Sequence, residues 1–444
     1  MKDLTTGSPA GRMLNFVLPV ALGNIFQLCY SLADTRVVGT FLGEGALAAV
    51  GATTSISTLF IGFLTGLMNG FAILIARGFG AGDEKSVRRY AAGSLLLGSL
   101  IAALITVLCV GLLYPILGIL NVPQELTQQA ASYIRVVLLG LLVTMLYNGC
   151  AAILRAVGDT TAPLLFLVIA AILNVGLDIL FVVPLHMGVA GAAIATVLAQ
   201  LVSVVLSLGY MVTRYPMFRF RAADFRVSGG EIRQLLSSGL SMAAMMSLVY
   251  FGTLALQCAI NTFGQDIIVA HTAARKLTEF FMLPFSVMGV TMATYCGQNM
   301  GAGKLDRIRV GIRQSLAITW IWSIGMMILS WTVAKELAWL VTGASKTEVL
   351  ETAALYLKVD TLFYFAPAAI GILRNALQGM GEHQVPVFSS MIELVGKVVA
   401  ALVLARLFGY WGIIAAEPIV WILMVIPLIV SVRKHLYREG KKDD

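Results

Sequence analysis

Charged residues are scarce along this chain. Only 12% of its 444 residues are Asp, Glu, Lys or Arg, and 59% are hydrophobic. A soluble globular domain carries about twice that share of charge, so the composition excludes a soluble protein. Apolar runs of about 20 residues recur instead along the chain, which is the length that a helix needs to cross a bilayer. These runs are continuously apolar rather than alternating, which argues against a transmembrane β-barrel.

Patterns that carry catalytic chemistry are also missing. The five cysteines form no CxxC pair and join no His/Cys cluster with metal-ligand spacing, so we interpret them as packing residues. The glycine-rich stretch RGFGAGD is followed by no GK[ST], which argues against a phosphate-binding loop and ATP hydrolysis on this chain. The sequence therefore predicts a protein that is not an enzyme and needs no cofactor. Residues 1–12 are polar and the apolar run after them is too long for a signal peptide, so we expect an uncleaved membrane anchor.

Twelve apolar spans are predicted, and the connections between them alternate in charge. The spans cover about 14–38, 46–74, 91–118, 133–155, 162–184, 188–213, 235–261, 268–297, 312–341, 354–378, 385–407 and 411–432. Basic connections alternate with connections nearly free of Lys and Arg. The positive-inside rule then predicts that both termini are cytoplasmic, and an even number of spans agrees in placing both on one side. The net charge of +8 therefore indicates the inner face of the membrane rather than a nucleic-acid partner.

The chain also repeats itself after about 221 residues. FGAGDEKSVRRY (79–90) resembles MGAGKLDRIRVG (300–311), and ILRAVGDTTAP (153–163) resembles ALQGMGEHQVP (376–386). The repeated unit is six helices, and an even number starts both halves on the same side. We therefore expect two bundles related by a pseudo-two-fold axis along the membrane normal, an arrangement typical of transporters. The predicted organisation is an N-terminal lobe (1–213), a cytoplasmic linker (214–233) and a C-terminal lobe (234–444).

The predicted linker mixes arginine with phenylalanine in RYPMFRFRAADFRV. Such a segment either lies along the membrane interface or is simply solvated. The sequence supports the two interpretations equally.

A polar stripe runs along the first span and ends in a carboxylate. Helical spacing places Gln27, Tyr30 and Asp34 on one face. Charged residues inside a span face a cavity or the bundle interior, which makes Asp34 a functional candidate. The alternative is a structural ion pair with Arg36, but residues two apart on a helix point in different directions.

The fifth and sixth spans bring further polar residues to matching depths. Asn174 and Asp178 are four apart and share a helix face. The chain turns near Met187, and Thr196 and Gln200 then return at the levels of Asp178 and Asn174. Such oxygen ligands suit a proton relay or Na⁺. The alternative is a hydrogen-bonded cluster that holds the two helices together, although such clusters seldom need a carboxylate.

The second half places different charges in its spans. Glu393 and Lys397 are four apart in the favourable order, so we interpret them as a neutralising pair. Arg275 and Glu279 have the same spacing and form a possible second pair. Glu417 has no partner in its own helix, so function and structure are equally good interpretations of it.

The sequence resembles the multidrug and toxic compound extrusion (MATE) transporters of prokaryotes along essentially its whole length. The motifs that carry the resemblance are LPVALGNIFQLCYSLADTRVVGTFLGEGALAAVG, GFGAGDEKSVRRY, LRAVGDTTAPL, ILNVGLDILFV, GVAGAAIATVLAQ and QNMGAGK, in that order. The resemblance implies twelve helices in two six-helix lobes, and export of organic, often cationic, compounds against an inward flow of Na⁺ or H⁺.

The resemblance also implies site residues. In the branch that couples through its first lobe, the family's aspartate, Asn, Asp and Thr fall on Asp34, Asn174, Asp178 and Thr196. The acidic residues that another branch uses for Na⁺ fall on Val249 and about Pro367, so that second-lobe site is expected to be absent. Candidates for lining the substrate cavity are Gln27, Tyr30, Gln200, Glu279 and Glu417.

The main hypothesis is therefore a secondary active antiporter that exports amphiphilic, cationic organic compounds in exchange for H⁺ or Na⁺ by alternating access. The alternative is a flippase for lipid-linked precursors from the same broad superfamily. Such flippases often carry extra helices and a basic cavity, whereas the first-half candidates of this chain are acidic. Expected partners are small organic substrates and the lipid bilayer, without nucleic acid, and the working unit is expected to be a monomer in the inner membrane.

Overall fold

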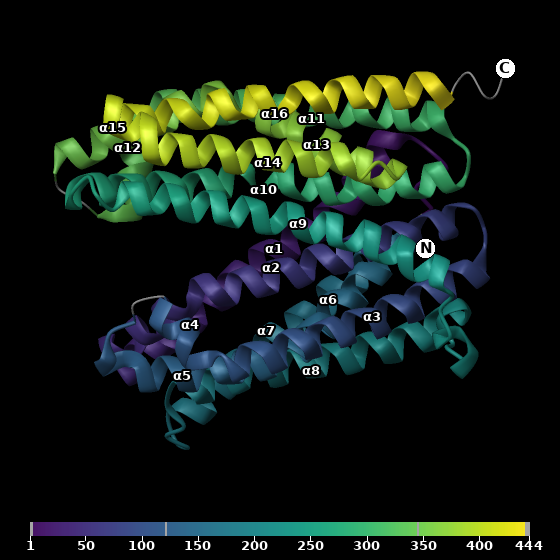
Figure 1. Cartoon of the computed structure of the whole chain (residues 1–444), viewed down its shortest axis with the longest axis horizontal. Coiled ribbons are helices and arrows are strands. Elements are labelled where there is room, and N and C mark those ends of the chain that lie inside the picture. The colour runs from purple at the N-terminus through teal and green to yellow at the C-terminus, as the bar shows by residue number, and fades with distance from the viewer. Residues whose placement is uncertain (1–2, 120–121, 344–345, 440–444) are drawn as a thin grey trace. The chain divides into compact units, whose positions relative to one another are not determined.

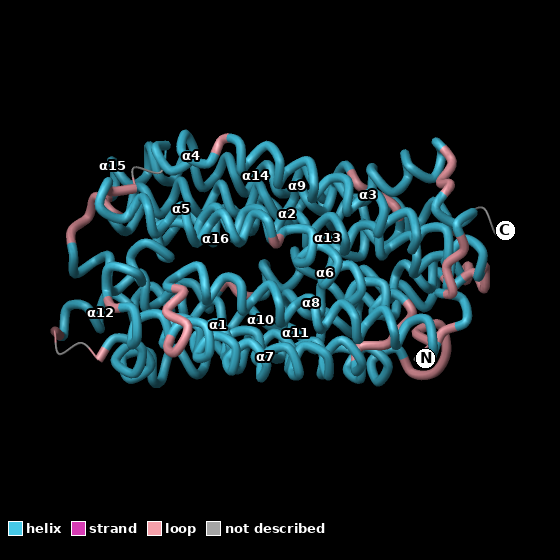
Figure 2. Tube along the Cα trace, turned by 90° about the horizontal axis from the view of Figure 1, so that it is seen from below, coloured by secondary structure: helices cyan, strands magenta, loops and turns pink. Residues whose placement is uncertain are grey.

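A computed structural model of the chain describes residues 3–119, 122–343 and 346–439. These residues form helices joined by short turns, and they contain no strand (Figure 2). Ten of the described helices are long and apolar enough to cross a membrane, and up to twelve spans result if each of two bent helix pairs is one span. Helices prevail because a chain in lipid must satisfy its backbone hydrogen bonds internally. The predicted all-α class is confirmed, with a span count that allows the predicted twelve.

The chain divides into two compact units, of which the first contains Leu18–Ala243. Most of α1 (Pro9–Leu42) and the start of α9 (Gly229–Ile260) belong to this unit (Figure 1). Between them lie α2 (Glu44–Gly80), α3 (Glu84–Gly111), α4 (Leu113–Ile119), α5 (Gln124–Leu139), α6 (Leu141–Ala156), α7 (Thr161–Val182) and α8 (Gly188–Arg214). Helices α5 and α6 are bent by 45° at their junction.

The second unit contains Leu4–Val17 and the chain from Ala244 onward. Its helices are the rest of α9, α10 (Gln265–Gly301), α11 (Leu305–Thr342), α12 (Thr347–Leu362), α13 (Phe365–Met380), α14 (Gln384–Val399), a π-helical turn (Ala400–Leu404), α15 (Ala405–Phe408) and α16 (Tyr410–Glu439). Helices α12 and α13 are bent by 53°.

The N-terminal segment is attached to the second unit, although the sequence analysis grouped it with the first half. The Leu4 amide donates to Gln298 Oε1 at 3.0 Å, and Lys304 Nζ donates to the Thr5 carbonyl at 2.9 Å. Arg307 Nη1 adds a bond of 2.9 Å to the Gly7 carbonyl. These bonds explain the grouping of Leu4–Val17 with α10 and α11; the lobe ranges expected from the sequence stay a prediction.

The two units share their turn geometry. Glycines with a left-handed backbone recur at equivalent places, 221 or 223 residues apart, where a side chain would strain the turn. These pairs are Gly43 and Gly264, Gly82 and Gly303, Gly158 and Gly381, and Gly188 and Gly409. A bent pair of helices follows α3 and α11 alike. The repeat seen in the sequence therefore extends to the backbone.

The linker after α8 folds onto the first unit rather than being simply solvated. It forms two short 3₁₀ turns, η1 (Pro216–Phe218) and η2 (Ala222–Phe225), and Phe218 is fully buried in the hydrophobic core of this unit. Arg88 Nε of α3 contacts Asp224 Oδ1 at 3.0 Å. Burial raises the pKa of Asp224, but the Arg221 amide and the Arg88 guanidinium outweigh it and hold that pKa below its usual range. The linker is thus an integral part of the unit.

Candidate functional site

The polar residues predicted on the fifth and sixth spans lie side by side in the first unit. Asn174 and Asp178 share one face of α7, and both are buried, with relative exposures of 2% and 0%. Helix α7 packs along α8, and Asn174 Nδ2 donates to Thr196 Oγ1 across that contact at 3.3 Å. Thr196 in turn donates to the Ala192 carbonyl at 3.2 Å. The polar faces of the two helices therefore meet, but the hydrogen bond joins Thr196 to Asn174, whereas the sequence analysis placed Thr196 level with Asp178.

Asp34 on α1 joins this cluster. Its carboxyl group is close enough to that of Asp178 for the two to share a hydrogen bond when one carries a proton. Asp34 Oδ1 and both oxygens of Asp178 are buried and accept no hydrogen bond from a described donor. The alternative pair with Arg36 is not formed, because the Arg36 side chain is exposed and no ion pair joins it to Asp34. Two carboxyl groups thus meet without a basic partner among the described residues.

A small cavity adjoins the cluster. Its volume is about 10 Å³, which is room for roughly one water molecule. Four predicted residues line the cavity: Tyr30, Asn174, Thr196 and Gln200. Tyr147, which the sequence analysis did not single out, lines it as well. The cavity suits a proton, a water or a small ion, and in this conformation it is too small for an organic substrate.

The other predicted cavity residues of this unit have defined partners. Gln200 Oε1 accepts a hydrogen bond from Thr144 Oγ1 at 2.7 Å. Gln27 is exposed and interacts with Tyr30 one turn further along α1. Tyr133 of α5, which the sequence analysis missed, interacts electrostatically with both aspartates. A tyrosine gives no distinctive signal in a span, since its ring packs like any other aromatic residue.

The donor set of this site consists of carboxylate, amide and hydroxyl oxygens. Such hard ligands suit a proton or an alkali cation and are poorly matched to a soft transition metal. The described residues contain no group of three or more His, Cys, Asp or Glu side chains placed to hold a metal ion. The oxygens of Asp34 and Asp178 that have no described donor are of this hard type.

The second unit has its own buried polar cluster. Arg275 Nη1 of α10 contacts both carboxylate oxygens of Glu417, at 3.1 and 3.3 Å, and the Tyr356 hydroxyl donates to the same carboxylate. One turn after Arg275, Thr278 Oγ1 donates to Asp360 Oδ2 at 3.2 Å. Glu417 and Asp360 are only 3% and 2% exposed. Glu417 is therefore held by a cation from another helix, and its role in binding substrate stays a prediction.

The other charged residues that the sequence analysis considered in the second half are the pair of Glu393 and Lys397 and the exposed Glu279. Lys397 Nζ contacts Glu393 Oε1 at 2.9 Å, which confirms the predicted pair, and Arg374 approaches the same carboxylate at 3.8 Å. Arg275 does not pair with Glu279, because Glu417 occupies it and the Glu279 side chain is exposed. The sequence analysis missed Asp360, although a lone carboxylate inside the predicted span 354–378 was a sufficient signal.

Comparisons with known proteins agree on one family. The family model MatE matches residues 19–180 and 241–403. A probable multidrug resistance protein YpnP of Bacillus subtilis is 26% identical over 369 residues, covering 82% of this chain and 80% of the relative. The probable multidrug resistance protein NorM of Thermotoga maritima is 24% identical and covers 94% and 89%. A FAD transporter of Shewanella oneidensis is 25% identical and covers 94% and 93%.

Solved structures share the fold of the chain. A multidrug resistance MATE family transporter in an outward-facing conformation matches with a TM-score of 0.90 and 23% identity, covering 99% of this chain and 98% of that one. A MOP superfamily transporter from Pyrococcus furiosus matches with a TM-score of 0.85 at 23% identity, covering 99% and 97%. With the family model spanning both units, the chain belongs to the MATE family of multidrug efflux transporters, which are multi-pass membrane proteins that move small molecules and are not enzymes.

Proposed function

We propose that this protein is a secondary active antiporter that exports amphiphilic, cationic organic compounds in exchange for H⁺ or Na⁺ by alternating access. Asp34, Asn174, Asp178 and Thr196 form the coupling site. The protein acts as a monomer in the cytoplasmic membrane of a prokaryote, with both termini in the cytoplasm. The family and the names of its relatives support export of small molecules over the flipping of lipid-linked precursors.

One observation carries the proposal: two carboxyl groups meet inside the first unit, and three of their oxygens accept no hydrogen bond from any described residue. Two bare carboxylates repel each other strongly in a medium of low dielectric constant. A proton or Na⁺ bound between Asp34 and Asp178 removes that repulsion and satisfies the free oxygens. Asn174 and Thr196 supply further oxygens beside the pair, with the amide oriented by its bond to the hydroxyl.

Coupling follows because the ion and the organic cation compete for the negative charge of Asp34 and Asp178. An organic cation that approaches the carboxyl pair also relieves the repulsion, so the ion-loaded and substrate-loaded forms are both favourable while the empty, doubly ionised form is not. A ligand shifts a conformational equilibrium only by its differential affinity for the two states. Exchange requires that the site is neutralised by one ligand or the other before the protein changes conformation.

The test is transport by purified protein in liposomes, with the pH gradient and the Na⁺ gradient imposed separately and no nucleotide present. A cationic dye is the first substrate, and FAD is the second because a relative carries that name. We expect export of the dye under at least one gradient. Asp34→Asn and Asp178→Asn fix the neutral state and should each abolish gradient-driven export while the protein stays folded.

The matched control is Glu44→Gln, which neutralises an exposed carboxylate of the same unit and should transport like the parent. A requirement for ATP would refute the antiporter. Unchanged rates and ion dependence in both Asn variants would refute the site and turn attention to Asp360 and Glu417. Transport of FAD without transport of the dye would refute the cationic substrate class.

A further inference from the structure

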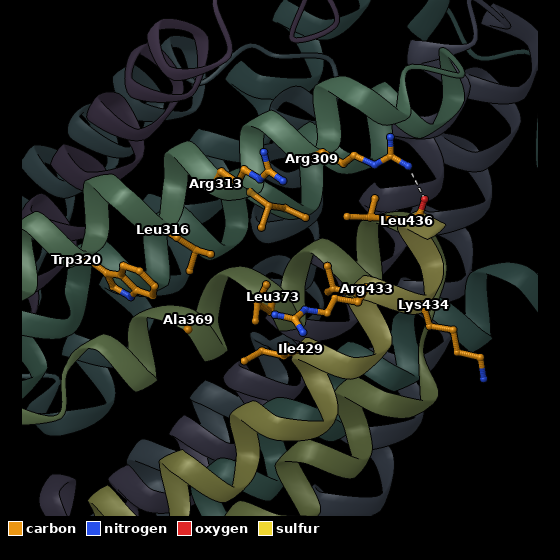
Figure 3. Close-up of a pocket in the computed structure, with 12 residues that line it drawn as sticks. Arg309, Arg313, Leu316, Trp320, Ala369, Leu373, Ile429, Arg433, Lys434 and Leu436 are labelled. Carbon is orange, nitrogen blue, oxygen red and sulfur yellow. Dashed lines mark hydrogen bonds between the residues drawn. The ribbon is translucent and has the colours of Figure 1, made fainter. Parts of the chain in front are cut away.

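A groove opens on the second unit between α11, α13 and α16. Its volume is about 920 Å³, at the upper end of the range for ligand sites. The walls are mostly apolar and include Leu316, Trp320, Leu373 and Ile429. Basic residues gather at one end: Arg309, Arg313, Arg433 and Lys434. Figure 3 shows α11 on one side of this groove and α16 on the other, with Arg433 extending into the space between them.

Two of the basic side chains at this end have no partner among the described residues. Arg309 is already used, because it contacts Asp306 at 2.7 Å and donates to the Leu436 carbonyl at 2.6 Å, which ties α11 to α16 (Figure 3). Arg313 and Arg433 are exposed and have no ion pair or hydrogen bond with any described residue. Two free guanidinium groups therefore stand at the mouth of an apolar groove, and guanidinium groups bind phosphate oxygens in a bidentate manner.

The first unit provides an internal comparison. There the equivalent helices α3 and α8 contact the linker turn η1, and Met217 and Phe218 are buried in the core between the helices that flank it. Arg88, which is equivalent to Arg309 by the repeat of 221, is paired with Asp224 of the same linker. The chain itself thus fills this place in the first unit.

Three basic residues of this groove have no basic counterpart at the equivalent positions of the first unit. By the same repeat, Arg313 corresponds to Ala92, Arg433 to Val212 and Lys434 to Thr213. The first unit therefore carries small or neutral residues where its own linker covers the helices. The second unit carries cations at the positions where no segment of the described chain covers them.

We propose that this groove, formed by α11, α13 and α16, binds an anionic membrane phospholipid. The phosphate is held by Arg313 and Arg433, and an acyl chain lies along Leu316 and Trp320. Trp320 follows Arg313 by seven residues, which places it two helical turns, or about 10 Å, deeper. Its indole Nε1 donates to the Phe365 carbonyl at 3.1 Å, so the ring is fixed as part of the wall.

The groove has the features that this ligand requires. A basic pocket between transmembrane helices is the recognised physical form of an anionic-lipid site. The combination of an apolar wall and a cationic mouth distinguishes phosphatidylglycerol both from a zwitterionic lipid and from a soluble phosphate. The inference goes beyond the proposed function, because lipid binding is measured without any transport.

The test uses the full-length protein in vesicles of phosphatidylcholine to which phosphatidylglycerol with brominated acyl chains is added. Bromine quenches tryptophan fluorescence at close range, and the part of the quenching lost in Trp320→Phe reports on this groove. We expect brominated phosphatidylglycerol to quench Trp320 at much lower mole fractions than brominated phosphatidylcholine does. Arg313→Gln/Arg433→Gln should weaken this preference roughly 30-fold, since two cations near the headgroup are lost.

The matched control is Lys335→Gln/Lys346→Gln, which removes the same charge from exposed residues of this unit that do not line the groove. The control should keep the preference. Equal quenching by the two lipids in the parent protein, which needs no variant and no assumption about folding, would refute the proposal. So would an unchanged preference in the arginine variant, or displacement of the lipid by millimolar glycerol 3-phosphate, which would indicate a site for free phosphate.

Discussion

At the scale of single residues, the two units handle buried charge in opposite ways. The first unit brings Asp34 and Asp178 together with no basic side chain beside them in the described chain, whereas the second unit neutralises Glu417 with Arg275. An ion pair in a low-dielectric interior does little for stability as a whole, but removal of one member leaves an uncompensated charge. The first arrangement is suited to binding a cation and the second to holding helices α10 and α16 together.

This difference predicts the effect of breaking the pair. Arg275→Gln should lower thermal stability in detergent more than Glu417→Gln, because the Glu417 side chain is only 4% exposed and the Arg275 side chain is 23% exposed. Loss of one partner from a buried pair costs about 3–5 kcal/mol of stability. Glu417→Gln should cost less than this, because the arginine that it leaves unpaired is partly exposed to solvent. The double variant should be more stable than Arg275→Gln alone, as a melting series will show.

The control is the exposed pair of Lys335 and Glu351, at 2.9 Å. Lys335→Gln should change stability by about 1 kcal/mol or less, because water screens such a pair. If Arg275→Gln melts like Lys335→Gln, the buried pair is not structural, and a transport role for Glu417 becomes the better interpretation.

The residue scale also shows what a sequence can predict about such a site. A helix face and a hairpin turn predicted that the polar residues of α7 and α8 come together, but not that Thr196 bonds to Asn174. The approach of Asp34 to Asp178, and of Arg275 to Glu417, depends on packing between helices far apart in the chain. Periodicity within a helix says which side chains face inward, but not which ones meet. Asp360 was predictable as an intramembrane carboxylate and was missed.

At the scale of helices, close packing in the second unit depends on glycine. A Cβ atom on Gly379 of α13 would lie 2.6 Å from the Ala293 carbonyl oxygen and 3.1 Å from the Gly297 amide nitrogen of α10. Both atoms belong to backbone that cannot rotate away. Small residues at a helix contact permit this approach, which is common in membrane proteins. The bends between α5 and α6 and between α12 and α13 were not predicted, because an apolar run looks the same whether straight or bent.

This contact predicts opposite effects for two identical substitutions. Gly379→Ala should destabilise the protein by about 1–3 kcal/mol, since α13 must move away from α10. Gly325→Ala on α11 meets no atom within 4 Å and should be neutral or stabilising by up to about 1 kcal/mol, because alanine favours the helix. Melting curves of the two variants in one detergent measure the difference. Equal effects would mean that the α10–α13 contact adjusts freely.

At the scale of the whole molecule, the distribution of charge predicts the orientation of the chain. Basic residues concentrate around the connection between α2 and α3, in the linker, at the start of α11 and in the C-terminal segment. Lys and Arg near the ends of spans are retained on the cytoplasmic side, where anionic lipids attract them. The fold does not reveal this direction, because a bundle of helices can be inserted either way. Orientation is therefore a property that the sequence predicts better than the structure does.

Single cysteines at two exposed positions test the orientation. Gln128 lies near the start of α5, in a connection nearly free of Lys and Arg, and Ser228 lies at the end of the basic linker. The five native cysteines are first replaced by alanine, which suits the three buried ones, and this background should show no labelling. An impermeant maleimide added outside intact cells should label Gln128→Cys but not Ser228→Cys, and both after permeabilisation. Labelling of Ser228→Cys alone from outside would reverse the topology, since an even number of spans fixes both termini on the side of the linker.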